Sequence, residues 1–416
     1  MIAEILSVGT ELLLGNTVNT DARDISEYLS ALGIDVGWHT VVGDNPGRLT
    51  DAVNIAKSRA DLIITTGGLG PTCDDLTKQV LAAAFGIELY FDETEAERIR
   101  GYFSRRIGRP MTENNLQQAW LPVGCTVFSN LWGTAPGCTF EKDGVRVIML
   151  PGPPRECRAM FENCAMPYLR TLGEGEIVSH NLRIFGRGES EVEFPLRERM
   201  NAMRNPTLAP YAKEGEMFLR VTAKAATREE AERMMEPVIA ELRESLGAVV
   251  YGVDATSLEA VVSDLLREKG LTLAAAESCT GGLLSKRMTD LPGASEVFRG
   301  GAVVYATDSK TSLLGVPAAL IEEKGVVSRE VALSLAENVR AVFSADFGVG
   351  ITGLAGPDGD GVHPVGTVFV ALAAADDSFV REIHGGRDRD RIRTMAASHA
   401  LDMLRRYMTG LPVEKI

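Results

Sequence analysis

The sequence lacks the marks of a disulfide-linked or membrane-spanning protein. Its six cysteines are scattered over 416 residues and none belongs to a Cys-x-x-Cys pair, which indicates reduced thiols and argues against a disulfide framework or a zinc site. No apolar run approaches the ~20 residues that a helix needs to span a bilayer. The chain begins on the strand-like run Ile2–Val8, without a basic, signal-like segment. We therefore expect a cytoplasmic protein that does not bind membranes.

The sequence also lacks any long basic run, and its net charge is −14 with a pI near 5.0. An acidic surface repels a phosphate backbone, so we expect no direct binding of nucleic acid. Small anionic ligands are not excluded, because loop amides and single arginines bind them locally. The hydrophobic content of 45% and the charged content of 24% are typical of a soluble globular protein, and the length predicts two or three domains.

Residues 1–170 alternate short apolar runs with helical patterns, which indicates an α/β domain with a mostly parallel sheet. We expect strands at 2–8, 35–42, 60–66 and 145–150, and helices at 21–32 and 48–59. Several of these strands end in loops rich in glycine, proline and small polar residues. Loops of this kind at the carboxyl ends of strands form the ligand crevice of an open α/β sheet.

The loop after the strand at 60–66 has the composition of a phosphate or metal site. It reads Gly67-Gly68-Leu69-Gly70-Pro71-Thr72-Cys73 and continues into Asp74 and Asp75. Backbone amides of a glycine-rich loop bind phosphate, and two adjacent carboxylates offer the hard oxygen ligands that Mg²⁺ prefers. The alternative is that Asp74 or Asp75 only caps the helix that starts there.

Residues 171–253 have a different pattern, typical of a small α+β connecting domain. Strands are expected at 181–185 and 217–225, and a helix at 227–247 in which Pro237 predicts a bend or a break. Residues 254–416 alternate strands and helices again, so a second α/β domain is expected there. The whole chain is therefore expected to have three domains, over 1–170, 171–253 and 254–416.

The clearest chemistry of the third region lies in the stretch 273–286. A short apolar run ends at Glu277, the polar segment Ser278-Cys279-Thr280 and two glycines follow, and helical spacing begins after them. The first amides of a helix have no partner inside the helix, and its dipole adds positive charge, so this junction is suited to an anion or an oxyanion. Ser278, Cys279 and Thr280 are adjacent candidates for a nucleophile. The alternative is that Ser278 or Thr280 is only a helix cap.

Four motifs of the first 170 residues resemble those of the CinA family, the competence/damage-inducible proteins. They are Gly9–Gly15, Gly67–Thr72 with Asp74-Asp75, Gly133–Gly137 and Leu150–Pro154. The N-terminal domain of that family is similar to the molybdopterin-binding fold, an α/β sandwich, and is associated with metal-dependent hydrolysis of the diphosphate of ADP-ribose. The resemblance implies a diphosphate site at Gly67, Gly68, Gly70 and Thr72, with a divalent metal such as Mg²⁺ held by Asp74, Asp75, Glu11 and Asp44.

The family also has a KH-like segment, which the resemblance places at 171–253. A KH domain grips an RNA backbone with a Gly-x-x-Gly loop, but this chain has Gly186-Arg187-Gly188-Glu189, followed by Glu191 and Glu193. Carboxylates in this position repel RNA. We therefore interpret the segment as a structural or dimerisation element, and the resemblance implies a homodimer.

The C-terminal region resembles the nicotinamide-nucleotide amidohydrolase family, which forms the C-terminal domain of CinA proteins. The matching blocks are Glu277–Gly282, Gly301–Lys310 and Thr352–Pro357. Thr352 stands where serine is commoner in the family, but it keeps a hydroxyl. The resemblance implies hydrolysis of nicotinamide mononucleotide to nicotinate mononucleotide and ammonia, without a cofactor. Ser278 would be the nucleophile, with Thr280 as a further catalytic residue beside it.

A serine nucleophile needs a base. No histidine lies in these blocks, although His363 is near one, so Lys310 is the better candidate, because burial lowers the pKa of a lysine. Tyr305 would orient Lys310 or relay the proton. Without the resemblance, Lys310 is more typical of a surface charge and Tyr305 of core packing. Cys279 is the rival nucleophile, because a helix N-terminus can depress the pKa of a thiol.

The remaining assignments concern substrate binding. The backbone amides of Thr280, Gly281 and Gly282 would form the oxyanion hole. Arg389 and Arg393 lie four residues apart and share one helix face, where they would add positive charge to the site unless that face is only solvated. The loop that would hold the nucleotide phosphate or ribose consists of Thr352, as a hydrogen-bond donor, with Gly353, Ala355 and Gly356.

Two other classes of function remain open on the sequence. The N-terminal domain would be a binding module if it held a pterin or a nucleotide without turning it over. A role as an accessory factor in DNA uptake or recombination is suggested only by the family name, and the acidic composition argues against direct contact with DNA.

Overall fold

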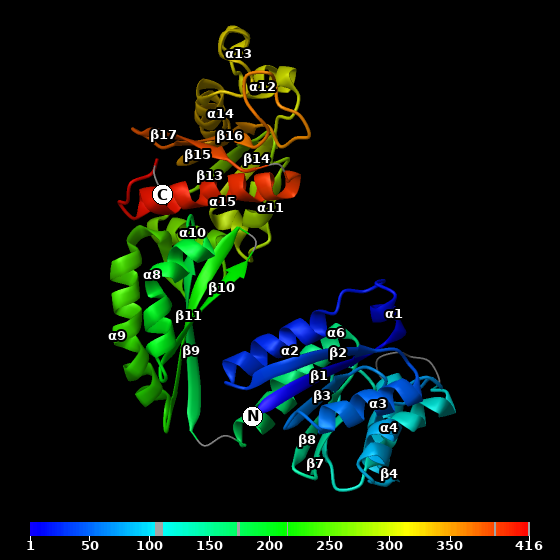
Figure 1. Cartoon of the computed structure of the whole chain (residues 1–416). Coiled ribbons are helices and arrows are strands. Elements are labelled where there is room, and N and C mark those ends of the chain that lie inside the picture. Colours follow the sequence, from blue (N-terminus) through cyan, green and yellow to red (C-terminus); the bar gives the residue numbers. More distant parts are fainter. Residues whose placement is uncertain (105–110, 173–174, 214, 387, 415–416) are drawn as a thin grey trace. The chain divides into compact units, whose positions relative to one another are not determined.

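The structure is a computed structural model that describes residues 1–104, 111–172, 175–213, 215–386 and 388–414. The chain forms two compact units (Figure 1): residues 1–178 with 224–231, and residues 179–223 with 232–416. The first unit holds the expected N-terminal α/β domain, and the second holds the C-terminal α/β domain with most of the connecting segment. Within the described residues, no helix has the length and apolar character needed to cross a membrane.

The N-terminal domain is built on a six-stranded sheet. β1 pairs in parallel with β2 and β3, and β3 pairs in parallel with β8, whereas β7 and β6 are antiparallel. The expected mostly parallel sheet is therefore confirmed. In spatial order the strands are β2 (Asp35–Val42), β1 (Ile2–Val8), β3 (Leu62–Thr66), β8 (Val145–Leu150), β7 (Gly137–Lys142) and β6 (Thr126–Phe128).

Helices cover both faces of this sheet. Alternate strand residues point to opposite faces, so Leu6 and Ile63 pack toward α3 (Pro46–Lys57) and α4 (Thr77–Ala84), whereas Ile5 and Ile64 pack toward α2 (Thr20–Ala31) and α6 (Pro154–Met160). The central strands are apolar throughout because both faces are buried. The remaining elements are α1 (Thr10–Leu13), β4 (Leu89–Phe91), α5 (Glu93–Tyr102), a 3₁₀ helix (Glu113–Ala119), β5 (Trp120–Pro122), a π-helical turn (Phe161–Ala165) and α7 (Met166–Arg170).

The connecting segment forms a four-stranded sheet with two helices, α8 (Glu189–Ala202) and α9 (Arg228–Leu246). α9 continues through Pro237, so the break expected there is wrong. Pro237 is exposed, and water can therefore hydrogen-bond the carbonyl that the missing proline N–H leaves without a partner. The strand order is β10 (Thr207–Lys213), β11 (Glu216–Ala225), β9 (Glu176–Ile184) and β12 (Val250–Val253).

The C-terminal domain is built on a five-stranded sheet in the order β14 (Phe298–Val303), β13 (Leu273–Glu277), β15 (Phe347–Gly353), β16 (Thr367–Ala373) and β17 (Ser378–His384). β13 is parallel to β14 and β15, and β16 and β17 are antiparallel. α10 (Leu258–Lys269), α11 (Leu283–Thr289) and α15 (Arg389–Met408) pack on one face (Figure 1). The other face carries α12 (Thr307–Leu314), α13 (Ala318–Lys324) and α14 (Arg329–Val342).

The carboxyl ends of the parallel strands place the predicted loops side by side. In the N-terminal domain the Gly67 N–H donates to the Leu150 carbonyl over 3.1 Å, which joins the loops after β3 and β8. In the C-terminal domain the Ser278 N–H donates to the Ile351 carbonyl over 3.0 Å, which holds the residue after β13 against β15. Both arrangements fit the rule that open α/β sheets bind ligands beyond the carboxyl ends of their strands.

Candidate functional site

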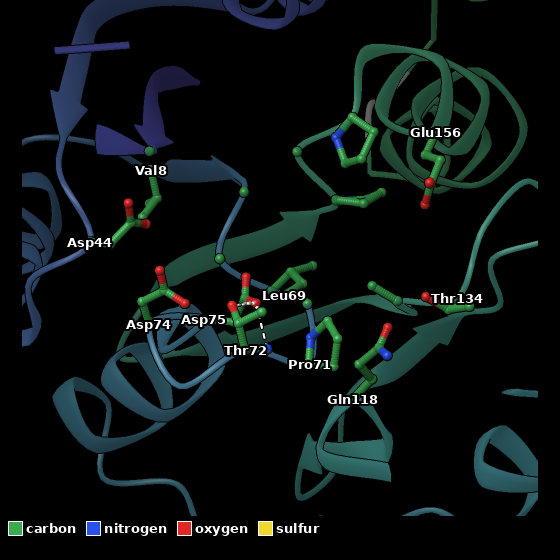
Figure 2. Close-up of a pocket in the computed structure, with 18 of the residues that line it drawn as sticks. Val8, Asp44, Leu69, Pro71, Thr72, Asp74, Asp75, Gln118, Thr134 and Glu156 are labelled. Carbon is green, nitrogen blue, oxygen red and sulfur yellow. Dashed lines mark hydrogen bonds between the residues drawn. The ribbon is translucent and has the colours of Figure 1, made fainter. Parts of the chain in front are cut away.

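A cavity of about 500 Å³ lies at the carboxyl ends of β1, β3 and β8 in the N-terminal domain (Figure 2). Its wall is formed mainly by the loops that follow these strands and β2. The fold thus brings together residues that are more than sixty positions apart in the sequence. All eight residues that the sequence assigned to the N-terminal site line this cavity, namely Glu11, Asp44, Gly67, Gly68, Gly70, Thr72, Asp74 and Asp75.

Two glycines of the loop are required by close packing. Gly67 and Gly68 both have a positive φ, of 90° and 67°. A Cβ on Gly67 would overlap the carbonyl oxygen of Val8, and one on Gly68 would overlap the hydroxyl of Thr77. The loop therefore packs against β1 and α4 with its backbone, and the wall of the cavity here is peptide rather than side chain.

Two of the carboxylates hold the shape of the cavity wall. Asp44 accepts hydrogen bonds from the backbone N–H and the hydroxyl of Thr10, both over 2.8 Å. Asp75 accepts from the backbone N–H of Thr72 over 2.9 Å and also from its hydroxyl. These bonds fix one oxygen of each carboxylate, and each carboxylate keeps further lone pairs for a ligand.

Neither Asp74 nor Asp75 caps the following helix. α4 begins at Thr77 after Leu76, and no side chain caps it, so the helix-cap alternative is wrong. The hydroxyl of Thr72 and the backbone N–H of Asp74 itself lower the pKa of the Asp74 carboxyl. Asp74 is exposed and stays ionised at neutral pH, as a metal ligand must.

The carboxylates of the cavity are better suited to a metal ion that binds together with a phosphate than to one that is held by protein side chains alone. Within the described ranges, no three acidic, histidine or cysteine side chains come close enough to hold an ion by themselves. Mg²⁺ is usually held by one or two carboxylates together with substrate phosphates. The side-chain donors of the cavity are oxygen atoms, most of them from carboxylates, and have the chemistry for such an ion. Asp74 and Asp75 are the residues that would hold it on the loop side.

Two residues of the cavity were missed by the sequence reading. Gln118 lies in the 3₁₀ helix and is fully buried, and Glu156 lies at the start of α6, where it accepts a hydrogen bond from Asn130 over 2.7 Å. Both belong to polar runs that the sequence shows before and after apolar strands. Nothing local distinguishes them from turn residues, and only the fold brings them to the cavity.

The second site lies in the C-terminal domain, where Lys310 reaches Ser278. The Lys310 Nζ lies 3.1 Å from the Ser278 Oγ. Lys310 is fully buried and Ser278 is 8% exposed. The two residues are joined because Ser278 follows β13, while Lys310 lies in α12, which follows the neighbouring strand β14.

Lys310 is surrounded by carbonyl groups. Its Nζ also donates to the carbonyl oxygens of Val304 over 2.7 Å, Tyr305 over 3.3 Å and Ala306 over 3.5 Å. Among the described residues it forms no ion pair, and burial lowers its pKa. Lys310 is therefore not a surface charge, and its amine is suited to giving up a proton more readily than an exposed lysine.

Cys279 does not have the properties of a reactive thiol. Burial raises its pKa to about 12, whereas the sequence suggested a depressed value at a helix N-terminus. The helix is the reason for the difference. α11 begins only at Leu283, and the buried carboxylate of Glu277 accepts from the N–H groups of Leu284 and Ser285 over 3.0 and 2.8 Å. The first turn of α11 is therefore occupied by Glu277 and offers no anion site.

The turn that follows Ser278 provides only part of the expected oxyanion hole. The Gly281 N–H donates to the Ser278 carbonyl over 3.0 Å, so it is not available to a substrate. Within the described segments, the N–H groups of Thr280 and Gly282 have no acceptor. The Thr280 hydroxyl is buried and also has no partner. These three donors next to Ser278 are therefore not used by hydrogen bonds within the described residues.

From the start of α15, Arg393 extends to this turn, and Arg389 extends to the loop after β15 and to Tyr305. Arg393 donates to the Thr280 carbonyl over 2.8 and 3.2 Å. Arg389 donates to the Gly356 carbonyl and to the Tyr305 hydroxyl, both over 2.8 Å. Tyr305 is 58% exposed and its hydroxyl is bound to Arg389. Tyr305 therefore contacts Lys310 through its backbone carbonyl and not through its hydroxyl, so the expected proton relay has no direct path.

The loop after β15 is held by packing as well as by polar contacts. The Thr352 hydroxyl donates to the Val326 carbonyl over 2.8 Å, so it is not available as the donor to a nucleotide that the sequence suggested. A Cβ on Gly353 would lie 2.7 Å from the Thr367 carbonyl, which explains the glycine. Ala355 is buried, and Gly356 has a φ of 91°. His363 contacts the ring of Phe369.

Comparisons with known proteins match the whole chain. The probable molybdopterin binding domain family matches residues 4–171, the damage-inducible protein CinA KH domain family matches 179–252, and the CinA C-terminal domain family matches 255–408. A CinA-like protein of Desulfovibrio desulfuricans is 51% identical over 100% of this chain and 98% of its own length. A CinA-like protein of Dictyoglomus turgidum is 47% identical over 99% of this chain and all of its own. A protein of Caldanaerobacter subterraneus named as competence-damage inducible is 46% identical over the full length of both.

Proposed function

The chain belongs to the CinA family, and from this membership and the geometry of its two sites we propose that it is a bifunctional pyridine-nucleotide salvage enzyme. The C-terminal domain would hydrolyse nicotinamide mononucleotide to nicotinate mononucleotide and ammonia. The N-terminal domain would hydrolyse the diphosphate of ADP-ribose with a divalent metal. The observation that carries the proposal is the buried pair of Lys310 and Ser278, with 3.1 Å between the amine and the hydroxyl.

The hydrogen bonds of Lys310 suit a general base. As a neutral amine it has two N–H groups and one lone pair. The N–H groups are directed to the carbonyls of Val304 and Tyr305, so the lone pair faces the hydroxyl of Ser278. Burial favours this neutral form. After Lys310 takes the proton from Ser278, its ammonium group has three N–H groups. These can donate to the carbonyl oxygens of Val304 and Tyr305 and to the Ser278 Oγ.

The reaction would proceed through an acyl-enzyme. The Ser278 Oγ attacks the carboxamide carbon while its proton passes to Lys310, and the oxyanion that forms is stabilised by the free N–H groups of Thr280 and Gly282. Lys310 then gives the proton to the departing nitrogen, which leaves as ammonia. A water molecule, deprotonated by Lys310, attacks the ester and releases the carboxylate. The proton returns to Ser278.

The nucleotide phosphate would be drawn to the start of α15. Arg389 and Arg393 place two guanidinium groups beside the turn, and each uses only part of its five donors on backbone carbonyls. An Arg–phosphate contact at this position would orient the carboxamide toward Ser278.

Ammonia release from nicotinamide mononucleotide, measured without metal, tests the C-terminal activity. We expect Ser278→Ala to lower kcat by about 10⁴-fold or more, because no nucleophile remains. Ser312→Ala, which removes an exposed hydroxyl from the same helix, α12, is the matched control and should keep activity. Turnover that survives in Ser278→Ala but is lost in Cys279→Ala would move the nucleophile to the cysteine. No turnover by the wild-type protein would reject the amidohydrolase.

The N-terminal proposal rests on the carboxylate-lined cavity. A bound divalent ion would neutralise the charge of the diphosphate and activate a water molecule for attack on phosphorus. The peptide wall at Gly67 and Gly68 would lie against the diphosphate. The side chains of Thr72 and Asp75 keep the loop in shape, and Asp74 and Asp75 would supply ligand oxygens. The products would be AMP and ribose 5-phosphate.

AMP release from ADP-ribose in the presence and absence of Mg²⁺ tests this second activity. Asp74→Asn should lower metal-dependent turnover by about 10²-fold, in the range seen when part of a metal site is lost. Asp51→Asn on the exposed side of α3 makes the same charge change away from the cavity and should have no effect. Binding of ADP-ribose without turnover would instead make the domain a binding module.

The assembly and the cellular role are part of the same proposal. We expect a homodimer, which sedimentation equilibrium would show as twice the chain mass of 44.8 kDa. Direct contact with DNA is not expected from a net charge of −14. A salt-sensitive shift of duplex DNA by the purified protein would favour the competence or damage-related accessory role instead.

A further inference from the structure

Gln118 places a buried hydrogen-bond acceptor without a partner at the N-terminal cavity. The residue is fully buried, it lines the cavity, and among the residues that the structure describes its Oε1 has no hydrogen-bond partner. We propose that this oxygen accepts a hydrogen bond from an N–H or O–H donor of the bound nucleotide, and that Gln118 thereby selects the substrate. The inference rests on the proposed function of the N-terminal domain, and it adds the group that the site recognises beyond the diphosphate.

The surrounding hydrogen bonds decide which end of the amide faces the cavity. The Thr112 carbonyl can only accept, and it accepts from the Nδ2 of Asn115 over 3.2 Å. The Oδ1 of Asn115 is thereby turned to Gln118 and accepts from its Nε2 over 3.1 Å. Reversing the Gln118 amide would set two oxygens against each other. The free end is therefore the acceptor, and a ligand must bring the donor.

The position of Gln118 is fixed relative to the loop that would hold the diphosphate. Lys78 in α4 donates to the Gln118 carbonyl over 2.6 Å. Two neighbours in the 3₁₀ helix are bonded to the glycine-rich loop, since Asn114 donates to the Pro71 carbonyl and Gln117 to the Thr72 carbonyl, both over 3.1 Å. Figure 2 shows Gln118 beside Pro71 and below Thr134, across the cavity from Asp44.

This placement defines the kind of donor. The carboxylates repel other acceptors, so the diphosphate with its metal occupies their side and the sugar or the base of the nucleotide extends toward Gln118. The groups of an adenine nucleotide that can donate are the ribose hydroxyls and the amine of the base. A buried acceptor left without a donor costs free energy, so a ligand that lacks the donor should bind more weakly.

The test is the affinity of the full chain for ADP-ribose, measured by calorimetry in the presence of Mg²⁺. In every ligand of this test a methylene group replaces the bridging oxygen of the diphosphate, so that no hydrolysis occurs. Gln118→Met keeps the length of the side chain and removes the acceptor. We expect about 10-fold weaker binding, the loss that one neutral hydrogen bond typically causes. Gln79→Met is the matched control, because the Gln79 Oε1 is also buried without a partner but Gln79 does not line the cavity. It should bind as the wild type does.

Analogues of ADP-ribose that each lack one donor separate recognition from a structural effect. One analogue carries unsubstituted purine in place of adenine, and the others lack a single ribose hydroxyl. In the wild type, one of these analogues should bind about 10-fold more weakly than ADP-ribose. In Gln118→Met, the same analogue and ADP-ribose should bind with equal affinity. That analogue identifies the donor as the amine or as a hydroxyl.

This inference is wrong, while the proposed function stands, in either of two cases. In the first, each analogue binds more weakly than ADP-ribose by the same factor in both proteins. In the second, Gln118→Met binds ADP-ribose with the affinity of the wild type. Failure of the wild type to bind ADP-ribose would overturn the proposed function of the domain and this inference with it.

Discussion

Lys310 is a cation that the fold buries without an acidic partner among the described residues, and this burial sets its chemistry. Loss of hydration favours the neutral amine, and the pKa is lowered. At a pH between the folded pKa and the unfolded value of 10.5, the unfolded chain binds more protons than the folded one. Lys310 therefore lowers stability at low pH, and this cost disappears as the pH rises toward 10.5.

Replacing Lys310 by Met should separate its role in catalysis from its effect on stability. Deamidation of nicotinamide mononucleotide should fall by 10²- to 10⁴-fold, roughly the contribution of a general base. The C-terminal domain should be no less stable than the wild type near neutral pH, because a buried charge has been removed. Calorimetric unfolding and ammonia release check the two effects, with Lys286→Met on the exposed side of α11 as the control. A variant that unfolds but keeps its specific activity would contradict the assignment.

Lys78 is a second buried lysine, beneath the N-terminal cavity, and burial lowers its pKa to about 8. Between pH 8 and 10.5 the unfolded chain binds the proton and the folded chain does not. The free energy of unfolding should therefore rise by roughly 3 kcal/mol across this window, at 1.36 kcal/mol per pKa unit. Below pH 8 the full cost remains.

Tryptophan fluorescence can follow this effect in one unit of the chain. All three tryptophans, Trp38, Trp120 and Trp132, lie in the first compact unit. Urea unfolding followed by their emission should show the rise with pH in the wild type and in Lys142→Met, an exposed control. The rise should be absent in Lys78→Met. An equal rise in all three proteins would show that another group causes it.

At the scale of the element, the turn between β13 and α11 is held by the strand's own last residue. The fully buried Glu277 accepts from the N–H groups of Leu284 and Ser285 and from the Ser285 hydroxyl over 2.6 Å. The carboxylate neutralises the positive end of the helix and closes the turn that contains Ser278. The site geometry thus depends on a residue that takes no part in the chemistry.

Glu277→Ala should loosen the start of α11. The amides of Leu284 and Ser285 should exchange with deuterium about 10- to 30-fold faster, which corresponds to the loss of a helix cap of roughly 1–2 kcal/mol. Activity at Ser278 should fall as well, because the turn loses its anchor. Glu268→Ala, at an exposed position of α10, is the control. Unchanged exchange at these two amides would show that Glu277 does not hold the turn.

At the scale of the whole molecule, the proposed activities lie in different compact units and use different chemistry. Removing divalent metal with EDTA should abolish the release of AMP from ADP-ribose and leave ammonia release from nicotinamide mononucleotide unchanged, because only the first depends on a metal ion. Ser278→Ala should abolish ammonia release and leave the release of AMP unchanged. Loss of both activities on chelation would mean that the C-terminal site also needs a metal or that the two units are coupled.

The sequence determined much of the fold by itself. The strands β1 and β8 were expected with the bounds they have, because apolar runs between turn residues leave little choice. α10 (Leu258–Lys269) lies between Ser257 as its N-cap and Gly270 as its C-cap, two residue types that favour these positions. The motifs also selected eight residues that line the N-terminal cavity, since a loop that must approach a neighbour with its backbone shows as glycine in the sequence.

Tertiary structure alone decided which groups are free to act. It buried Lys310 against Ser278 across 32 positions of sequence, and it used the Thr352 hydroxyl and the Gly281 N–H within the protein. It also left the oxygen of Gln118 without a partner at the cavity. The physical reason is that sequence patterns record the local preferences of the backbone, whereas burial and hydrogen-bond partners depend on residues that meet only after the sheets have formed.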